Sequence, residues 1–196
     1  MIRLIDILLS FLGIIILSPL LLLIAILIKL NSKGPVLYKQ IRVGISNCDF
    51  KLLKFRTMEL NSDKAGLLTI GARDSRVTTV GYYMRSFKLD ELPQLFNVFL
   101  GEMSLVGPRP EVRKYVDLYT IEQQRVLSVK PGITDWASIK YRNENIILEK
   151  SKDPEFDYIN KIIPDKISYN LIYIKNYSVS EYFKIIFATF WHIIHF

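Results

Sequence analysis

One apolar segment near the N-terminus restricts what this chain can fold into. From Ile7 to Ile28 the sequence is almost wholly apolar, and about 22 residues are enough for one helix across a bilayer. No small-residue cleavage site follows, as a signal peptide would require, and the chain runs on through Lys29 and Lys33 into its body. We therefore expect a membrane helix that remains part of the protein.

The middle of this segment carries the pair Ser18-Pro19. Proline removes an amide donor and clashes with the preceding turn, so a kink or break is expected there. Basic residues flank both ends, with Arg3 before the segment and Lys29 and Lys33 after it, so the cytoplasmic preference of basic residues gives no orientation. From the residues alone, a kinked crossing and a re-entrant helix–break–helix stay equally open.

Composition limits the partners and the chemistry. Lys and Arg number 26 against 19 Asp and Glu, a net charge of +7, yet half of the residues are apolar. Such a surface suits lipid headgroups, phosphorylated substrates or nucleic acid, and since no recognition motif is present we expect no nucleic-acid partner. One cysteine, Cys48, and two histidines at the far end exclude an internal disulfide and a zinc cluster. Catalysis would have to rest on carboxylates, Arg and Lys.

The rest of the chain is predicted to form one α+β body that is mostly helical, with a short β-hairpin. It has no internal repeat and no phosphate-cradling glycine loop. Residues 61–76 are polar and predict a loop. The expected strands are Val36–Tyr38 and Asp49–Met58, and the expected helices are Gly81–Phe87, Asp90–Gly101 and Tyr182–Phe196.

The second of these helices carries an acidic pair. Pro93 is tolerated only in the first turn, which places Asp90 and Glu91 at the N-terminal end, and Gly101 ends the helix. Apolar residues at helical spacing predict one buried face: Leu89, Leu92, Leu95, Phe96 and Phe99. Adjacent acids project about 100° apart on a helix, so one could act as nucleophile or base while the other holds a divalent cation. Acids are also common at helix starts, so the pair alone is weak evidence.

Cationic residues strengthen the chemical interpretation. Arg109 lies between Pro108 and Pro110 in a rigid loop, which disfavours a merely solvated role. Guanidinium groups match phosphate oxygens and suit a diphosphate. Each of the other candidate phosphate-binding residues could equally be a surface charge or half of an ion pair: Lys54, Arg56, Arg85 and Arg142.

The C-terminal helix is amphipathic and rich in aromatic residues. Ser178 and Glu181 match a capping box at its start. Aromatic residues of this density, with a lysine and two histidines, suit a helix in the headgroup region, and packing as an ordinary core helix stays open.

With these features the chain resembles the bacterial sugar transferases, that is, the small monotopic phosphoglycosyl transferases. The similarity covers nearly the whole chain, and LDELPQLFNV together with MSLVGPRP is long and specific. The matching stretches after the Ser18-Pro19 segment are Lys33–Gly44, Lys54–Met58, Asp74–Gly81, Met84–Glu111, Lys130–Thr134, Arg142-Asn143 and Tyr173–Ser178.

The resemblance implies a fold, a place in the cell and a reaction. Residues 1–33 would form a re-entrant membrane helix, broken at Ser18-Pro19, and residues 34–196 a catalytic domain on the cytoplasmic face of the bacterial inner membrane, with its C-terminal helix at the interface. The enzyme would move a sugar phosphate from a UDP-sugar to undecaprenyl phosphate with release of UMP, the first membrane step of a surface glycan.

The resemblance also assigns roles to residues. Asp90 would be the nucleophile that carries the phospho-sugar, and Glu91, beside Asp90, would help bind Mg²⁺. Lys54, Arg85, Arg109 and Arg142 would hold phosphate groups, and the Pro108–Pro110 loop would lie near the uridine.

The chain departs from the family pattern at a few positions. Tyr141 stands where many members have glycine, Asn170 where an acid is common, and Glu181 where aspartate is common. These departures leave the sugar unassigned. The apolar surface faces either lipid or a second copy, so a homodimer stays open. A non-catalytic membrane scaffold with the same fold is the alternative, against which the intact acidic pair and basic residues argue.

Overall fold

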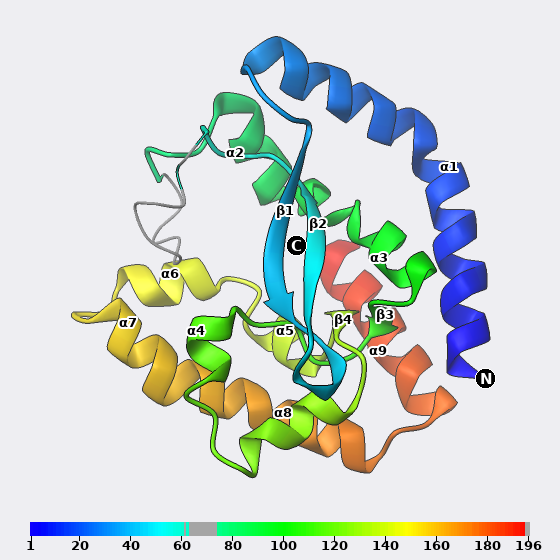
Figure 1. The fold of residues 1–196 in the computed structure, drawn as a ribbon, viewed down its shortest axis with the longest axis vertical. Coiled ribbons are helices and arrows are strands. Elements are labelled where there is room, and N and C mark those ends of the chain that lie inside the picture. Colours follow the sequence, from blue (N-terminus) through cyan, green and yellow to red (C-terminus); the bar gives the residue numbers. More distant parts are fainter. Residues whose placement is uncertain (61, 63–73, 195–196) are drawn as a thin grey trace.

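The computed structural model describes residues 1–60, 62 and 74–194, so most of the predicted polar loop at 61–76 lies outside the described residues. The first element is helix α1 (Ile2–Asn31), which contains Pro19. Figure 1 shows that α1 runs along one edge of the molecule and changes direction partway, so the expected kink is present while the helix stays continuous. It is long and apolar enough to cross a membrane, and only 11% of its most apolar window is buried.

The N-terminal arm of α1 is bonded to the body through a buried acid. The Asp6 carboxylate, 2% exposed, accepts hydrogen bonds from the Ser104 hydroxyl at 3.0 Å and the Leu105 amide at 2.9 Å. The Tyr182 hydroxyl donates a further bond to Asp6 at 2.7 Å. Arg3 donates to the Val98 carbonyl at 2.6 Å and to the Phe99 carbonyl at 2.8 Å.

The C-terminal arm of α1 rests on the same body. Ile24 and Ile28 are buried in a cluster with Phe55 and Met84. Arg56 holds the end of the helix, since its Nη2 donates to the Ser32 carbonyl at 2.9 Å and to the Ser32 hydroxyl at 2.8 Å. Both arms therefore contact one folded unit, whereas a straight crossing would carry one arm away from it.

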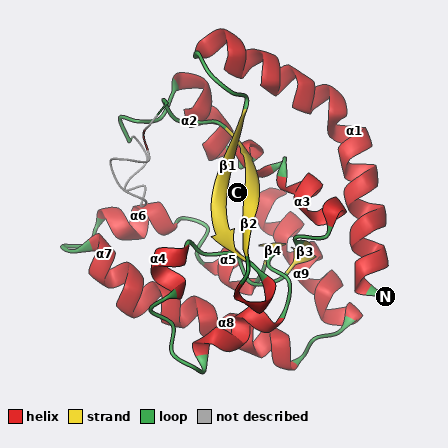
Figure 2. Ribbon diagram, in the orientation of Figure 1, coloured by secondary structure: helices red, strands yellow, loops and turns green. Residues whose placement is uncertain are grey.

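The predicted β-hairpin is confirmed. Strands β1 (Leu37–Val43) and β2 (Asp49–Phe55) pair antiparallel, with Tyr38 opposite Lys54, and lie at the centre of the molecule among helices (Figure 2). Helix α2 (Thr79–Ser86) matches the expected helix, and the Thr78 hydroxyl caps it by accepting from the Gly81 amide.

Helix α3 (Gln94–Leu100) corrects the expected buried face. Its buried residues are Gln94, Asn97 and Val98, whereas Phe96 and Phe99 are 38% and 39% exposed. Apolar spacing identifies the apolar side of a helix but not what covers that side. Here Phe99 stacks on Phe11 of α1, so the apolar side of α3 continues the exposed apolar surface of α1. Gly101, with φ 93°, ends α3 as predicted.

A second, unexpected sheet supports the loop that carries Arg109. Strands β3 (Ser104–Val106) and β4 (Gly132–Thr134) pair in parallel. Gly107 and Gly132 allow the close approach, since a Cβ on Gly132 would stand 2.0 Å from the Gly107 amide nitrogen. The Gly132 amide then donates to the Pro108 carbonyl at 3.0 Å.

The remaining helices enclose these sheets. They are α4 (Arg113–Val116), α5 (Trp136–Lys140), α6 (Glu144–Glu149), α7 (Pro154–Asp157), α8 (Ile163–Lys175) and α9 (Val179–Ile194). The expected cap of α9 is present, with the Glu181 amide donating to the Ser178 hydroxyl at 3.2 Å. Helix α9 buries Tyr182 and Ile185 and leaves Phe187 and Trp191 exposed, so it packs on the body by one face only. The mostly helical α+β fold is as predicted.

Replacing Asp6 by leucine should destabilise the protein. The substitution leaves the Leu105 amide and the hydroxyls of Ser104 and Tyr182 without their shared acceptor, a loss of roughly 3 kcal/mol. We expect thermal unfolding in detergent to occur about 10 °C lower. Asp6→Asn is the matched control, because its amide oxygen can still accept; equal losses in both variants would contradict the hydrogen-bond explanation.

Candidate active site

The acidic pair lies in a short 3-10 turn that precedes α3. Lys88 takes a left-handed conformation, with φ 57°, and the turn covers Leu89–Glu91. Helix α3 then begins at Gln94, with Pro93 before it. The predicted start of this helix near Asp90 is therefore too early for α3 itself. The two acids lie in a separate 3-10 turn that leads into α3 through Leu92 and Pro93, both of which have helical backbone angles.

Glu91 forms the centre of a cluster of charges. Arg109 donates to both carboxylate oxygens of Glu91, from Nη1 to Oε2 at 3.0 Å and from Nη2 to Oε1. Lys54, from the end of β2, places its Nζ 3.6 Å from Oε1. The side chains of Glu91 and Lys54 are only 14% and 17% exposed, so the cluster is poorly screened by water.

Burial and charge shift the titration of this cluster. Burial alone would raise the pKa of Glu91, but Arg109 and Lys54 more than offset it and hold that pKa well below its usual range. Burial lowers the pKa of Lys54 to about 8, against the opposing attraction of Glu91. Glu91 is therefore an anion at neutral pH, and Lys54 is a cation that can lose its proton just above neutrality.

Asp90 differs from Glu91 in its hydrogen bonds and in the direction of its pKa shift. It is 9% exposed, and its Oδ1 is buried without a hydrogen-bond partner among the described residues. Burial, aided by the charge of Glu91, raises the pKa of Asp90, while Lys54 and Arg85 act in the opposite direction. A poorly solvated carboxylate oxygen near cations is suited to attack an electrophile or to bind a cation.

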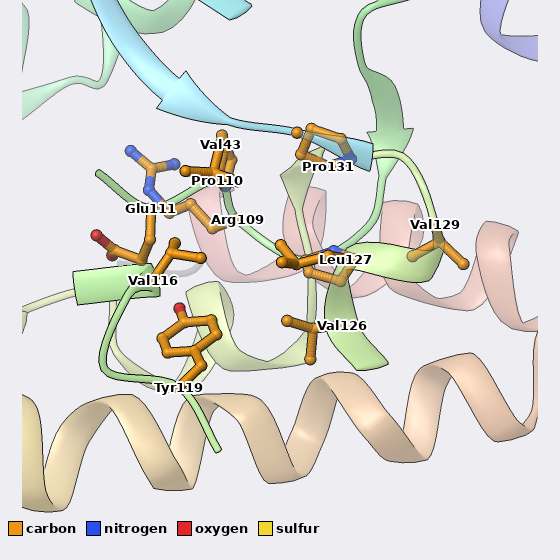
Figure 3. Close-up of a pocket in the computed structure, with 12 residues that line it drawn as sticks. Val43, Arg109, Pro110, Glu111, Val116, Tyr119, Val126, Leu127, Val129 and Pro131 are labelled. Atoms are coloured by element: carbon orange, nitrogen blue, oxygen red, sulfur yellow. The ribbon is translucent and has the colours of Figure 1, made fainter. Parts of the chain in front are cut away.

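The loop that presents Arg109 is held from both sides. Arg42 of β1 donates to the Pro110 carbonyl at 2.9 Å, and the Arg109 amide donates to Asp135 Oδ2 at 3.2 Å. Tyr158 and Arg42 also bond Glu111 at the end of the loop. Figure 3 shows this loop, with Arg109, Pro110 and Glu111, above Tyr119 and Val126.

Sequence reasoning missed Arg42, Asp135 and Glu111 as supports of this site. Asp135 had a readable signal, because an acid three residues before Ser138 at a helix start is an N-cap pattern. Arg42 had none, since its partner lies 68 residues away.

Two of the predicted phosphate-binding residues lie elsewhere. Arg56, 6% exposed, is occupied at the end of α1 by Ser32 and Lys33. Arg142 donates to the His192 carbonyl of α9. The structure brings together Lys54, Glu91 and Arg109, with Asp90 beside them and Arg85 within electrostatic reach, and assigns Arg56 to the support of α1.

The acidic pair fits a magnesium ion only in combination with a phosphorylated ligand. The described residues contain no cluster of three or more acidic, histidine or cysteine side chains that could hold a metal. Mg²⁺ is commonly bound by one or two carboxylates together with substrate phosphates and water. The unpartnered Oδ1 of Asp90 could serve as one such ligand, whereas both oxygens of Glu91 are bonded to Arg109.

Fold and site together define a protein with a membrane-length apolar helix and an Asp-Glu site that adjoins the cationic side chains of Lys54 and Arg109. The chain belongs to the bacterial sugar transferase family, whose model matches residues 1–196.

Several curated relatives are similar over two thirds or more of this chain. A UDP-glucose:undecaprenyl-phosphate glucose-1-phosphate transferase of Klebsiella pneumoniae is 41% identical over 95% of this chain and 38% of its own length. A UDP-N-acetylgalactosamine-undecaprenyl-phosphate N-acetylgalactosaminephosphotransferase of Aeromonas hydrophila is 41% identical over 94% of this chain and 41% of its own. An uncharacterized sugar transferase, EpsL, of Bacillus subtilis is 44% identical over 68% of this chain and 64% of its own. The chain spans about two fifths of the first two relatives.

Proposed function

We propose that this protein transfers a sugar phosphate from a UDP-sugar to undecaprenyl phosphate. In the first step an Asp90 carboxylate oxygen bonds to the sugar-bearing phosphorus, and the bond from that phosphorus to the bridging oxygen breaks, so UMP leaves. In the second step a phosphate oxygen of the polyprenyl acceptor bonds to the same phosphorus and Asp90 departs as a carboxylate. The product is a polyprenyl diphosphate sugar, and no oxidant or reductant is needed.

The observation that carries this proposal is the buried, unpartnered Oδ1 of Asp90 beside a cluster of cations. A carboxylate becomes a competent nucleophile toward phosphorus when nearby positive charge neutralises the incoming phosphate. Lys54 and Arg109 supply that charge, and Arg85 adds to it. The names of the relatives support the classes of donor and acceptor.

Mg²⁺ is proposed as the cofactor. When bound to the donor phosphates, it would take Asp90 as a protein ligand, with Glu91 as a second ligand only after one of its oxygens leaves Arg109, and it would neutralise phosphate charge and help UMP to leave. Arg109 and Lys54 hold Glu91 as an anion, and they would also orient the diphosphate.

Release of UMP tests the reaction. The purified chain in detergent, supplied with undecaprenyl phosphate, Mg²⁺ and a panel of UDP-sugars, should release UMP from at least one sugar. Omission of the acceptor should reduce release to at most one UMP per protein, because the phospho-sugar then stays on Asp90. A non-catalytic scaffold would release no UMP with any sugar, and that result would overturn the proposal.

We further propose that α1 enters and leaves the membrane on the cytoplasmic face of the inner membrane. Both arms of α1 are bonded to the same body, through Asp6 and through Arg56. The exposed apolar residues of α1, α3 and α9 would lie in the membrane or at its interface.

Cysteine labelling checks this topology. With the exposed Cys48 replaced by serine, single cysteines at Leu4 and at Lys33 should both resist an impermeant maleimide in intact cells. Both should react once the inner membrane is permeabilised. Labelling of one of the two in intact cells would mean that α1 crosses the membrane.

The pH dependence of the reaction should report Lys54. Because the pKa of Lys54 is lowered to about 8, the free protein loses this positive charge as the pH rises through 8. We expect kcat/KM for the UDP-sugar to fall by about tenfold per pH unit above that point. The acid limb of the profile should report the raised pKa of Asp90, which must ionise to attack. Lys54→Arg should remove the alkaline limb, because arginine stays charged; an unchanged limb would assign it to another group.

A further inference from the structure

The backbone of the Arg109 loop is held by an acid from a distant part of the chain. Pro108 and Pro110 have no amide hydrogen, so Arg109 supplies the only amide donor of this tripeptide. That amide donates to Asp135 Oδ2 at 3.2 Å. Asp135 therefore fixes the backbone from which the Arg109 guanidinium reaches Glu91.

Asp135 divides its two carboxylate oxygens between two elements. The residue is 0% exposed, and its Oδ1 accepts from the Ser138 amide, which makes Asp135 the N-cap of α5. Buried polar atoms in folded proteins are almost always hydrogen-bonded, and both oxygens of Asp135 satisfy this rule. Capping of α5 accounts for Oδ1, whereas Oδ2 serves the Arg109 loop.

The residues on both sides of Asp135 are bonded to helix α9. The hydroxyls of Thr134 and Thr189 share a hydrogen bond of 2.8 Å. The Trp136 Nε1 donates to Glu181 Oε1, also at 2.8 Å. Thr189 and Glu181 both belong to α9, which lies beside β4 and α5 (Figure 1). Because its neighbours are held before and after it, the Asp135 carboxylate has one fixed place from which to bond the loop.

Charge joins Asp135 to Arg109 as well. The charge of Glu91, and to a lesser degree that of Asp135, raises the pKa of Arg109. Arg109 is thus held at two points, by Glu91 at its guanidinium and by Asp135 at its amide. A misplacement of about 1 Å in a group that contacts the substrate can cost about a hundredfold in rate, so support of this backbone bears on the reaction.

We propose that Asp135 is a positioning residue for the transfer: through Oδ2 it sets the place from which Arg109 meets Glu91 and the donor phosphates. This proposal rests on the reaction proposed above. In this role Asp135 contacts no substrate and acts through Arg109. Its effect should therefore depend on an intact Arg109 guanidinium.

Asp135→Asn tests the proposal, because asparagine caps a helix about as well as aspartate does. The amide oxygen can still accept from Ser138. The amide NH2 group then faces the Arg109 amide, donor against donor, so the bond to the loop is lost. We expect kcat/KM for the UDP-sugar, measured by UMP release, to fall by about tenfold.

Asp153→Asn is the matched control. Asp153 caps α7 by the same pattern, accepting from the Phe156 amide at 3.0 Å, and it is exposed. This substitution should change kcat/KM by less than about twofold. Thermal unfolding in detergent would show that each variant is folded at the temperature of the assay.

A double variant separates positioning from a general structural effect. When Arg109 is already lysine, Asp135→Asn should lower kcat/KM by less than about twofold further, because residues that act as a unit are not additive. A further loss of about tenfold in that background would show that Asp135 acts independently of Arg109, and would overturn the proposal. An unchanged kcat/KM in a folded Asp135→Asn protein would overturn it too.

Other outcomes separate the possible failures. If Asp135→Asn does not fold, Asp135→Ser provides the same comparison, since the single serine oxygen can cap α5 without bonding the loop, and Asp153→Ser is then the control. An unaltered kcat/KM in Asp135→Ser would overturn the positioning role. A wild-type chain that releases no UMP would instead overturn the transfer reaction itself, and with it any role of Asp135 in that reaction.

Discussion

Asp90→Asn should abolish transfer, lowering UMP release by at least about a thousandfold. The amide keeps the size of the side chain but is a far poorer nucleophile, and it cannot form the acyl phosphate that the acceptor then displaces. The loss should appear in kcat. Binding of the UDP-sugar should weaken little or even tighten, because the substitution removes a buried negative charge that would repel the donor phosphate.

A labelling experiment separates the nucleophile from a role in binding. With a UDP-sugar labelled at the sugar-bearing phosphate and no acceptor, the wild-type chain should retain label on the protein, and Asp90→Asn should retain none. Asp117→Asn is the matched control, because Asp117 is an exposed acid paired only weakly with Arg113, at 3.6 Å. Retention of label by Asp90→Asn would show that another residue carries the phospho-sugar.

Arg109→Lys should lower kcat/KM for the UDP-sugar by about a hundredfold, although the charge is kept. Arg109 contacts both oxygens of Glu91 at once, and lysine offers a single point charge that cannot reproduce this pair of bonds. Glu91 would then be left with Lys54 alone, at 3.6 Å, and would be held less firmly.

The control for this variant is Arg125→Lys, at an exposed position in the turn Gln123–Ser128. It should leave kcat/KM unchanged. Thermal unfolding would show whether Arg109→Lys acts through stability, since loss of a partner from a buried ion pair also destabilises the fold. An unchanged kcat/KM in a folded Arg109→Lys protein would mean that Arg109 does not contact the phosphates.

Much of the site was predictable because it depends on residues that are close together in the sequence. Asp90 and Glu91 are adjacent, and the rigidity of the Arg109 loop follows from the two prolines that flank it. The hairpin was also predictable, since its strands are neighbours in the chain. Local patterns failed where the result depends on which element packs on a helix face. The apolar residues of α3 predicted a face buried in protein, but Phe96 and Phe99 are exposed.

The roles of the cations depended on contacts that no local pattern encodes. Five basic residues were candidates for phosphate binding in the sequence, and only Arg109 stood out, because of its rigid loop. The fold joins Lys54 and Arg109 to Glu91, whereas Arg56 supports the end of α1 and Arg142 contacts α9. Which anion or carbonyl a long cationic side chain meets depends on the packing of whole elements.

An apolar, kinked helix at the N-terminus and an acidic pair followed by a rigid Pro-Arg-Pro loop can be read from the order of the residues alone. The support of both arms of α1 by one body follows only from the packed fold, and so does the pairing of Glu91 next to an Asp90 Oδ1 that has no partner among the described residues. The residues that make these contacts are far apart in the chain. Tyr182 bonds Asp6 from 176 residues away, and Arg109 bonds Glu91 from 18, so these contacts arise only when the elements pack together.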